Sequence, residues 1–225
     1  MLAGWHSRGA QQAAAGGIEF VEGISRSSVT SIISFDISEY GIAAGDLIII
    51  AIPRNTPSSH NSSITGVSVT QFIKTAANTS FSWIECLYGY LLGSETTITI
   101  ESMAANNATS VVVFRNATFG AVSGVDFSSA IQTANPPPLS GFDVDNDVVV
   151  TKIMMAAYDS YSAIIAPTGY VTAASAFIRE ERYSGAGSCI GYRLADSSTE
   201  DPTTFQNTPA FVGGAGSFTL KIKPS

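Results

Sequence analysis

The chain has 225 residues, a formal net charge of −7 and only 13% charged residues, whereas 45% of its residues are hydrophobic. Its basic residues are scattered singly, so it lacks the Lys/Arg clusters that bind phosphates, and we expect no nucleic-acid binding. Its longest apolar runs, such as 47–52, are far shorter than the roughly 20 residues that span a bilayer, so we expect no membrane insertion.

The first segment is rich in Ala, Gln and Gly and has no hydrophobic periodicity. We expect residues 1–17 to form an extended N-terminal arm, in which Leu2 and Trp5 are the candidate contacts with a partner chain. The start of the chain has no cationic stretch followed by an apolar one, so we also expect no secretory signal peptide.

The first half of the remaining chain is predicted to be a series of strands. Gly45 and Asp46 predict a turn before a buried strand at 47–52, which Pro53 is expected to end. Alternating apolar residues and β-branched content predict further strands at 18–21, 29–37, 66–74, 80–92, 96–102 and 109–115.

The second half is predicted to follow after a long connection. Residues 116–140 are expected to cross between the halves as a rigid, extended segment, because they contain Pro136, Pro137 and Pro138. Further strands are predicted near 147–158, 169–180, 187–195, 203–207 and 216–223. No stretch has the helical periodicity that would predict a helix.

The two halves repeat the same landmarks at a spacing of about 100 residues. An Asp precedes an aliphatic run at Asp46 and at Asp147, and further matches pair Tyr90 with Tyr192 and Cys86 with Cys189. We therefore predict an all-β fold, namely one jelly-roll-like β-sandwich domain at 18–225 with an internal two-fold duplication. The pseudo-repeats are expected at about 45–115 and 146–223.

Catalytic patterns are weak, and we expect a protein that is not an enzyme and has no cofactor or metal. The only histidines are His6 and His60, and the sequence around Ser188 lacks the glycines of a nucleophile elbow. The acidic run 143–147 resembles the start of a calcium loop but lacks its glycine and its final Glu, so a solvated turn before the apolar strand is the favoured interpretation. The segments 179–182 and 200–201 could supply two carboxylates for glycoside hydrolysis, but a self-neutralising hairpin tip is the favoured interpretation of 179–182.

The cysteines and the loops complete the predictions. Cys86 and Cys189 lie among apolar residues and are expected to be buried free thiols rather than a disulfide. Recognition is expected on loops rather than on a sandwich core, so the loops 53–63 and 158–168, which follow equivalent strands, should lie at corresponding ends of the domain. The candidate contact residues there are Arg54, His60, Tyr158 and Tyr161.

The order of these landmarks resembles that of small structural proteins of tailed-phage virions. The matching pieces are the Gly-Asp turn at 45–46, the Pro-Thr-Gly-Tyr segment at 167–170, the Tyr-containing strand at 192–194 and the closing strand 217–223. The resemblance implies a non-enzymatic virion protein that decorates the capsid or forms part of a spike, fibre or tail. Its partners would be copies of itself and other virion proteins, after assembly in the host cytoplasm. The alternative is a carbohydrate- or receptor-binding module that contacts a host-surface glycan through its loop tyrosines.

Overall fold

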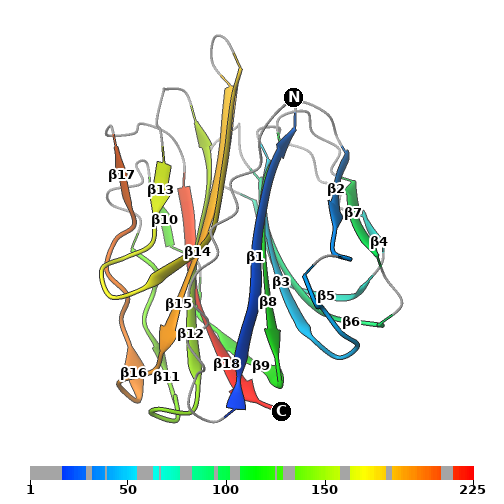
Figure 1. Ribbon diagram of the computed structural model, residues 1–225. Coiled ribbons are helices and arrows are strands. Elements are labelled where there is room, and N and C mark those ends of the chain that lie inside the picture. Colours follow the sequence, from blue (N-terminus) through cyan, green and yellow to red (C-terminus); the bar gives the residue numbers. More distant parts are fainter. Residues whose placement is uncertain are drawn as a thin grey trace.

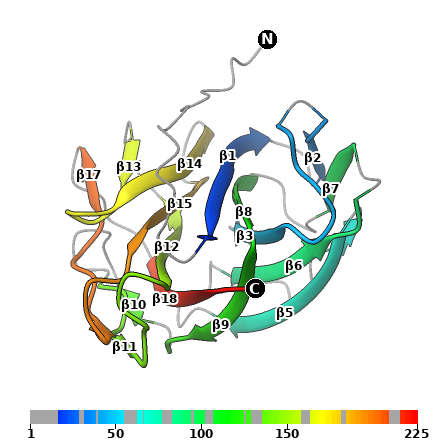
Figure 2. The ribbon, with the colours of Figure 1, turned by 60° about the horizontal axis from the view of Figure 1, so that its bottom comes forward.

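The chain folds into antiparallel β-sheets, and the described residues contain no α-helix, which confirms the predicted all-β class (Figure 1). The computed structural model describes residues 17–28, 32–38, 40–54, 63–65, 67–76, 83–93, 96–101, 107–124, 126–128, 135–157, 163–180, 184–208 and 215–225. Two large sheets form the centre of the molecule, and smaller sheets lie outside them (Figures 1 and 2).

The first large sheet has five strands in the order β1-β8-β3-β6-β5. They are β1 (Glu19–Ser28), β8 (Asn107–Arg115), β3 (Leu47–Arg54), β6 (Trp83–Leu91) and β5 (Val67–Ala76). The second has six strands in the order β10-β18-β12-β15-β14, and β9 also pairs with β18. They are β9 (Ala117–Val122), β10 (Asp126–Ser128), β18 (Ala215–Pro224), β12 (Val148–Ala157), β15 (Ser184–Leu194) and β14 (Val171–Glu180).

Three small sheets cover the outer faces of the large ones. The order β2-β7-β4 joins β2 (Ile32–Asp36), β7 (Thr97–Glu101) and β4 (Ser63–Thr65) over the first large sheet. On the opposite side of the molecule, β11 (Leu139–Ser140) pairs with β16 (Thr199–Glu200), and β13 (Ala163–Ile165) pairs with β17 (Gln206–Thr208). Figure 2 places β2 and β7 at one side and β13 and β17 at the other, with the large sheets between them.

The continuous aliphatic run of β3 is explained by burial on both of its faces. Leu47, Ile49 and Ala51 face the second large sheet and share one core with residues of β12, β15 and β18. The alternate residues Ile48, Ile50 and Ile52 face the small sheet β2-β7-β4. A strand between two packed layers needs apolar residues at every position, whereas a half-exposed strand alternates.

The turn that precedes each central strand is held in the same way in both halves. Before β3, the Gly45 N–H donates to Leu91 O at 2.9 Å and the Leu91 N–H donates to Asp46 O at 3.0 Å. Before β12, the Asp145 N–H donates to Ala195 O at 3.0 Å and the Ala195 N–H donates to Asp147 O at 3.0 Å. Each central strand is therefore joined at its start to the end of its β6 or β15 neighbour.

Two aromatic stacks join the large sheets. Phe20 of β1 stacks on Tyr192 of β15 with ring centroids 4.6 Å apart and planes 16° apart. Phe119 of β9 stacks on Tyr88 of β6 at 4.2 Å and 12°. Each stack joins a strand of one large sheet to a strand of the other, and the two stacks use different strands of each sheet.

Two predictions about strand boundaries are wrong. Pro53 does not end its strand, because β3 continues to Arg54 beside β6. Pairing of β3 with β8 stops at Ala51, so the missing N–H of Pro53 leaves no gap in that ladder. The segment 116–140 is not a plain crossing either, because it contains β9, β10 and β11, and β9 and β10 pair with successive parts of β18.

Candidate functional site

Most residues predicted to contact a partner lie outside the described residues. These are Leu2, Trp5, His60, Tyr158 and Tyr161, while Arg54 is the last residue of β3 and its side chain also lies outside the described part. The strands that lead to the two loops both end at the upper end of the molecule in Figure 1, β3 at Arg54 and β12 at Ala157. The segment predicted as the loop 158–168 contains the short strand β13.

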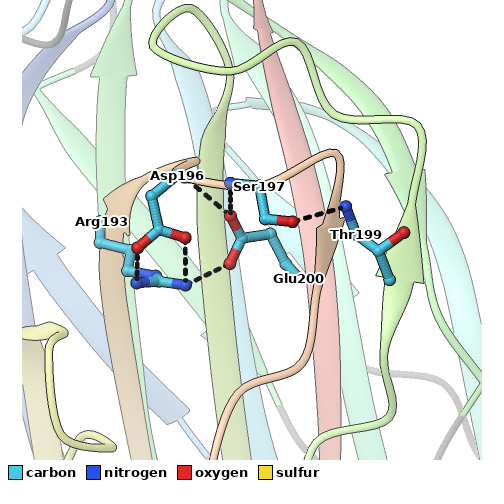
Figure 3. Close-up of polar contacts among 5 residues, drawn as sticks. All are labelled: Arg193, Asp196, Ser197, Thr199 and Glu200. Atoms are coloured by element: carbon cyan, nitrogen blue, oxygen red, sulfur yellow. Dashed lines mark hydrogen bonds and ion pairs between the residues drawn. The ribbon is translucent and has the colours of Figure 1, made fainter.

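The best-defined polar cluster surrounds Arg193 on the outer face of β15 (Figure 3). Its guanidinium forms a paired contact with Asp196, through Nη1 to Oδ2 at 2.5 Å and through Nη2 to Oδ1 at 3.1 Å. The same Nη2 also donates to Glu200 Oε2. Glu200 Oε1 accepts from the backbone N–H groups of Asp196 at 2.9 Å and Ser197 at 3.1 Å. The turn between β15 and β16 is thus tied to one carboxylate.

Burial and the neighbouring side chains shift the pKa of Arg193 in opposite directions. Burial is the largest single effect and lowers the pKa of Arg193, but the hydrogen bond to Glu200, the interactions with Tyr170 and the charge of Glu200 together outweigh it, so this pKa is raised. The guanidinium also lies 4.9 Å from the centre of the Tyr170 ring. Burial raises the pKa of Tyr170 to about 12. At neutral pH the cluster therefore holds one permanent cation, facing a neutral phenol and the two carboxylates.

The Arg193 cluster stabilises a turn and is poorly suited to catalysis. The Glu200 side chain is fully buried, with a relative exposure of 0%. Its two oxygens already accept hydrogen bonds from three donor groups, so no substrate proton has access to it. The glycosidase interpretation of residues 200–201 is therefore unsupported here, while the carboxylates of 179–182 lie outside the described side chains.

A second ion cluster performs the same task in the first half. Arg115 at the end of β8 donates from Nε and Nη2 to the buried Asp46 at 3.1 and 2.9 Å, and from Nη2 to Gly41 O at 2.7 Å. The Asp46 carboxylate also accepts from the Ala43 N–H at 2.8 Å. The hydrogen bond to Asp46 is the main reason that the pKa of Arg115 is raised. The turn before β3 is thereby fastened to the end of β8.

The acidic run 143–147 forms a turn that is held by its own hydrogen bonds and by Ala195. The buried Asp147 accepts the Asp143 N–H at 2.9 Å through Oδ2, and Asp145 has a positive φ of 64°. Within the described ranges, no three His, Cys, Asp or Glu side chains are placed to hold a metal ion. The Asp147 carboxylate, one of the three that this run would offer to a calcium ion, thus accepts a backbone hydrogen bond instead.

Two residues weighed as reactive groups lie in the interior. Ser188 lies between the large sheets, where Oγ donates to Ala108 O at 2.6 Å and contacts Ser110 Oγ at 2.7 Å. Near it, the buried Lys152 donates from Nζ to Ile50 O at 3.2 Å. Cys189 is a buried free thiol, as predicted, and burial raises its pKa; the side chain of Cys86 lies outside the described part. Neither Ser188 nor Cys189 has the access that a nucleophile needs.

Sequence reasoning missed the two ion clusters and the two aromatic stacks. A weak signal for the first was present, because Arg193 and Asp196 are three residues apart beside a predicted strand end. No local signal joins Arg115 to Asp46, or Phe20 to Tyr192, because each pair is brought together only by sheet pairing and packing.

Comparisons of the chain with protein-family models, with curated proteins and with solved structures find no match. The part of the chain that the structure describes contains no helix with the length and apolarity needed to cross a membrane.

Proposed function

We propose that the chain is a tandem of two jelly-roll units packed back to back, at about residues 18–115 and 117–224. An eight-stranded jelly roll, with strands named B to I in chain order, has the sheet orders B-I-D-G and C-H-E-F. The first eight strands in chain order give β1-β8-β3-β6 and β2-β7-β4, which correspond to B-I-D-G and C-H-E. Strand F corresponds to β5, which pairs with β6 at the edge of the large sheet.

The second unit supports the same assignment. Its large sheet has β9 and β10 beside β18, followed by β12 and β15, again in the order B-I-D-G. Its pairs β11–β16 and β13–β17 correspond to C–H and E–H, with strand H divided in two. The duplication is therefore proposed to begin earlier than residue 45, since β1 and β9 both belong to it.

The register supports the match residue by residue. We matched Leu47 of β3 with Val148 of β12 and followed the strand pairing outward in each sheet. Phe20 then takes the position of Phe119, and Tyr88 takes the position of Tyr192. The bulge after Phe20 in β1 then falls at the position of the bulge after Phe119 in β9. Bulges also coincide in β5 and β14, between Gln71 and Ile73 and between Thr172 and Ala174. In this match Tyr192 corresponds to Tyr88 rather than to Tyr90, and Cys86 to Ile190 rather than to Cys189.

We infer that this tandem is a non-enzymatic structural protein of a phage virion, in the capsid decoration, a spike, a fibre or the tail. The strand order carries the proposal by analogy of fold, because jelly rolls recur in viral capsid and lectin domains. The two ion clusters also favour a structural role. Asp46 with Arg115, and Glu200 with Arg193, hold turns together. Its partners would be other virion proteins and copies of itself, contacted by the arm 1–17.

A second candidate is binding of a host-surface glycan or receptor. It is favoured by the placement of the strand ends, because β3 and β12 both lead to the upper end of the molecule in Figure 1. The residues that follow include His60, Tyr158 and Tyr161, and aromatic side chains on loops are typical of sugar sites.

The test of the first candidate is incorporation into particles. Deletion of residues 1–17 should abolish incorporation, measured by mass spectrometry of purified particles, and leave cooperative thermal unfolding intact. A control variant that keeps Leu2 and Trp5 but changes Gln11 and Gln12 to Ala should incorporate normally. Normal copy number of the deleted chain would refute the arm as an anchor. Binding to a glycan array that is lost in Tyr158→Ala and Tyr161→Ala would favour the second candidate instead.

A further inference from the structure

The two proposed units are joined by one residue. β8 ends at Arg115 and β9 begins at Ala117, so Asn116 alone connects the large sheets. Asn116 is exposed and has a φ of 54°, a left-handed conformation that residues with a side chain rarely adopt, Asn more readily than most. The C-terminus lies at the bottom of Figure 1, near β9 and β18, and its last residue Ser225 is hydrogen-bonded to Asn116.

Few contacts hold this reversal closed. The Asn116 side chain donates from Nδ2 to Gly17 O at 3.2 Å, and Asn116 O accepts the Ser225 N–H at 3.1 Å. The second bond extends the pairing of β9 with β18, which already joins Ala117 to Pro224. Both contacts are single hydrogen bonds at an exposed position, where each is worth little net free energy.

The surface between the units is built as in a symmetric dimer. A two-fold interface requires that if a residue of one partner contacts a second residue, the reciprocal contact also occurs. With Phe20 matched to Phe119 and Tyr88 to Tyr192, the stacks Phe20–Tyr192 and Phe119–Tyr88 are such reciprocal contacts. Around them the shared core contains buried side chains from both units, among them Leu47, Val112, Val148 and Leu220.

We propose that a second copy of this chain can exchange units with the first, giving a domain-swapped dimer that opens at Asn116. This inference rests on the proposed tandem of units. When Asn116 takes an extended conformation, β8 and β9 form one continuous path, and unit one of each chain packs on unit two of the other. The interface of the monomer is then formed twice between chains, and the left-handed backbone at Asn116 is relieved. A short hinge between two units that share one interface is the feature that promotes such swapping.

The test is the oligomeric state of full-length variants, measured by light scattering after size-exclusion chromatography. Asn116→Val should shift the monomer–dimer equilibrium toward the dimer by about tenfold for each hinge, because a β-branched residue strongly disfavours positive φ. Asn116→Gly tolerates the closed turn and should give less dimer than the unchanged chain after refolding at high concentration. The matched control is Asp145→Val, since Asp145 has a φ of 64° in a turn inside one unit. It should lose stability but stay monomeric.

The kinetics of dissociation separate swapping from surface association. A swapped dimer must unfold its inter-unit contacts to separate, so it should survive dilution for hours, whereas a surface dimer dissociates at once. A monomeric or rapidly dissociating Asn116→Val variant would overturn the proposal, as would equal dimerisation of Asp145→Val. If Asn116→Val does not fold, the dimer fraction of Asn116→Gly is compared with that of the unchanged chain. Equal dimer fractions in these two proteins would refute swapping. The measurement needs no particle, so its failure is independent of the virion proposal.

Discussion

Phe20 and Tyr192 stack across the two large sheets, with ring centroids 4.6 Å apart, although they lie at opposite ends of the sequence. Phe114 adds an edge-on contact to each of them, at 5.7 Å in both cases. The three rings belong to the inter-sheet core, and the stack of Phe119 on Tyr88 packs against the same core. Much of the stability of the sheet-to-sheet packing should therefore depend on these aromatic side chains.

Removing the ring of Phe20 from the buried stack should lower the stability of the protein strongly. We expect Phe20→Ala to lower the free energy of unfolding by about 3–5 kcal/mol, because it removes a ring that is 6% exposed and leaves a cavity between the sheets. Phe119→Ala should cost less, since Phe119 is only partly buried. Urea unfolding followed by fluorescence or circular dichroism measures both. A smaller loss for Phe20→Ala than for Phe119→Ala would contradict this account of the core.

Gly23 allows β1 to approach the second large sheet. A Cβ at this position would lie 1.9 Å from the backbone oxygen of Ala173, a distance that requires the strands to move apart. We expect Gly23→Ala to destabilise the protein by about 1–3 kcal/mol or more. The matched control is Gly124→Ala, where nothing lies within 4 Å of the added methyl group. This change should leave the melting temperature unchanged or raise it slightly.

The buried Glu200 should be sensitive to loss of its charge. Glu200→Gln keeps an oxygen for the backbone N–H groups but leaves Arg193 without its buried ionic partner. We expect a loss of about 2–3 kcal/mol, below the cost of breaking a fully buried pair because Arg193 is partly exposed. Asp201→Asn, at an exposed neighbouring position, should change stability by less than about 0.5 kcal/mol. Equal effects in chemical denaturation would disprove the role of Glu200 in the turn.

The raised pKa of Tyr170 predicts a loss of stability in alkaline solution. The folded protein holds the phenolic proton up to a pKa of about 12, above the ordinary value of 10.0, so folding binds a proton between these values. This contribution to stability is complete below pH 10 and is lost as the pH rises toward 12. Tyr170→Phe should remove part of this pH dependence while changing neutral stability little. Unfolding measured from pH 9 to 12 for both proteins tests it; identical slopes would refute it.

Local chemistry was sufficient to predict the elements whose signals lie close together in the chain. The all-β class, the buried strand after Asp46 and the turn before Val148 follow from β-branched runs, from Gly and Asp at turns and from the lack of helical periodicity. These features depend on backbone preferences within a few residues, and they are visible without knowing which strands pair.

The partners of those elements were decided only by tertiary structure. The segment 116–140 has little local strand signal, and it becomes β9 and β10 because β18 offers an open edge for pairing. Pro53 stays within its strand because β8 has already separated from β3 at that point. Glu200 was a candidate glycosidase carboxylate, yet the closing of the β15–β16 turn buries it against Arg193. In each case the outcome depends on contacts between residues distant in sequence or on the closure of a turn, and local propensity carries no information about them.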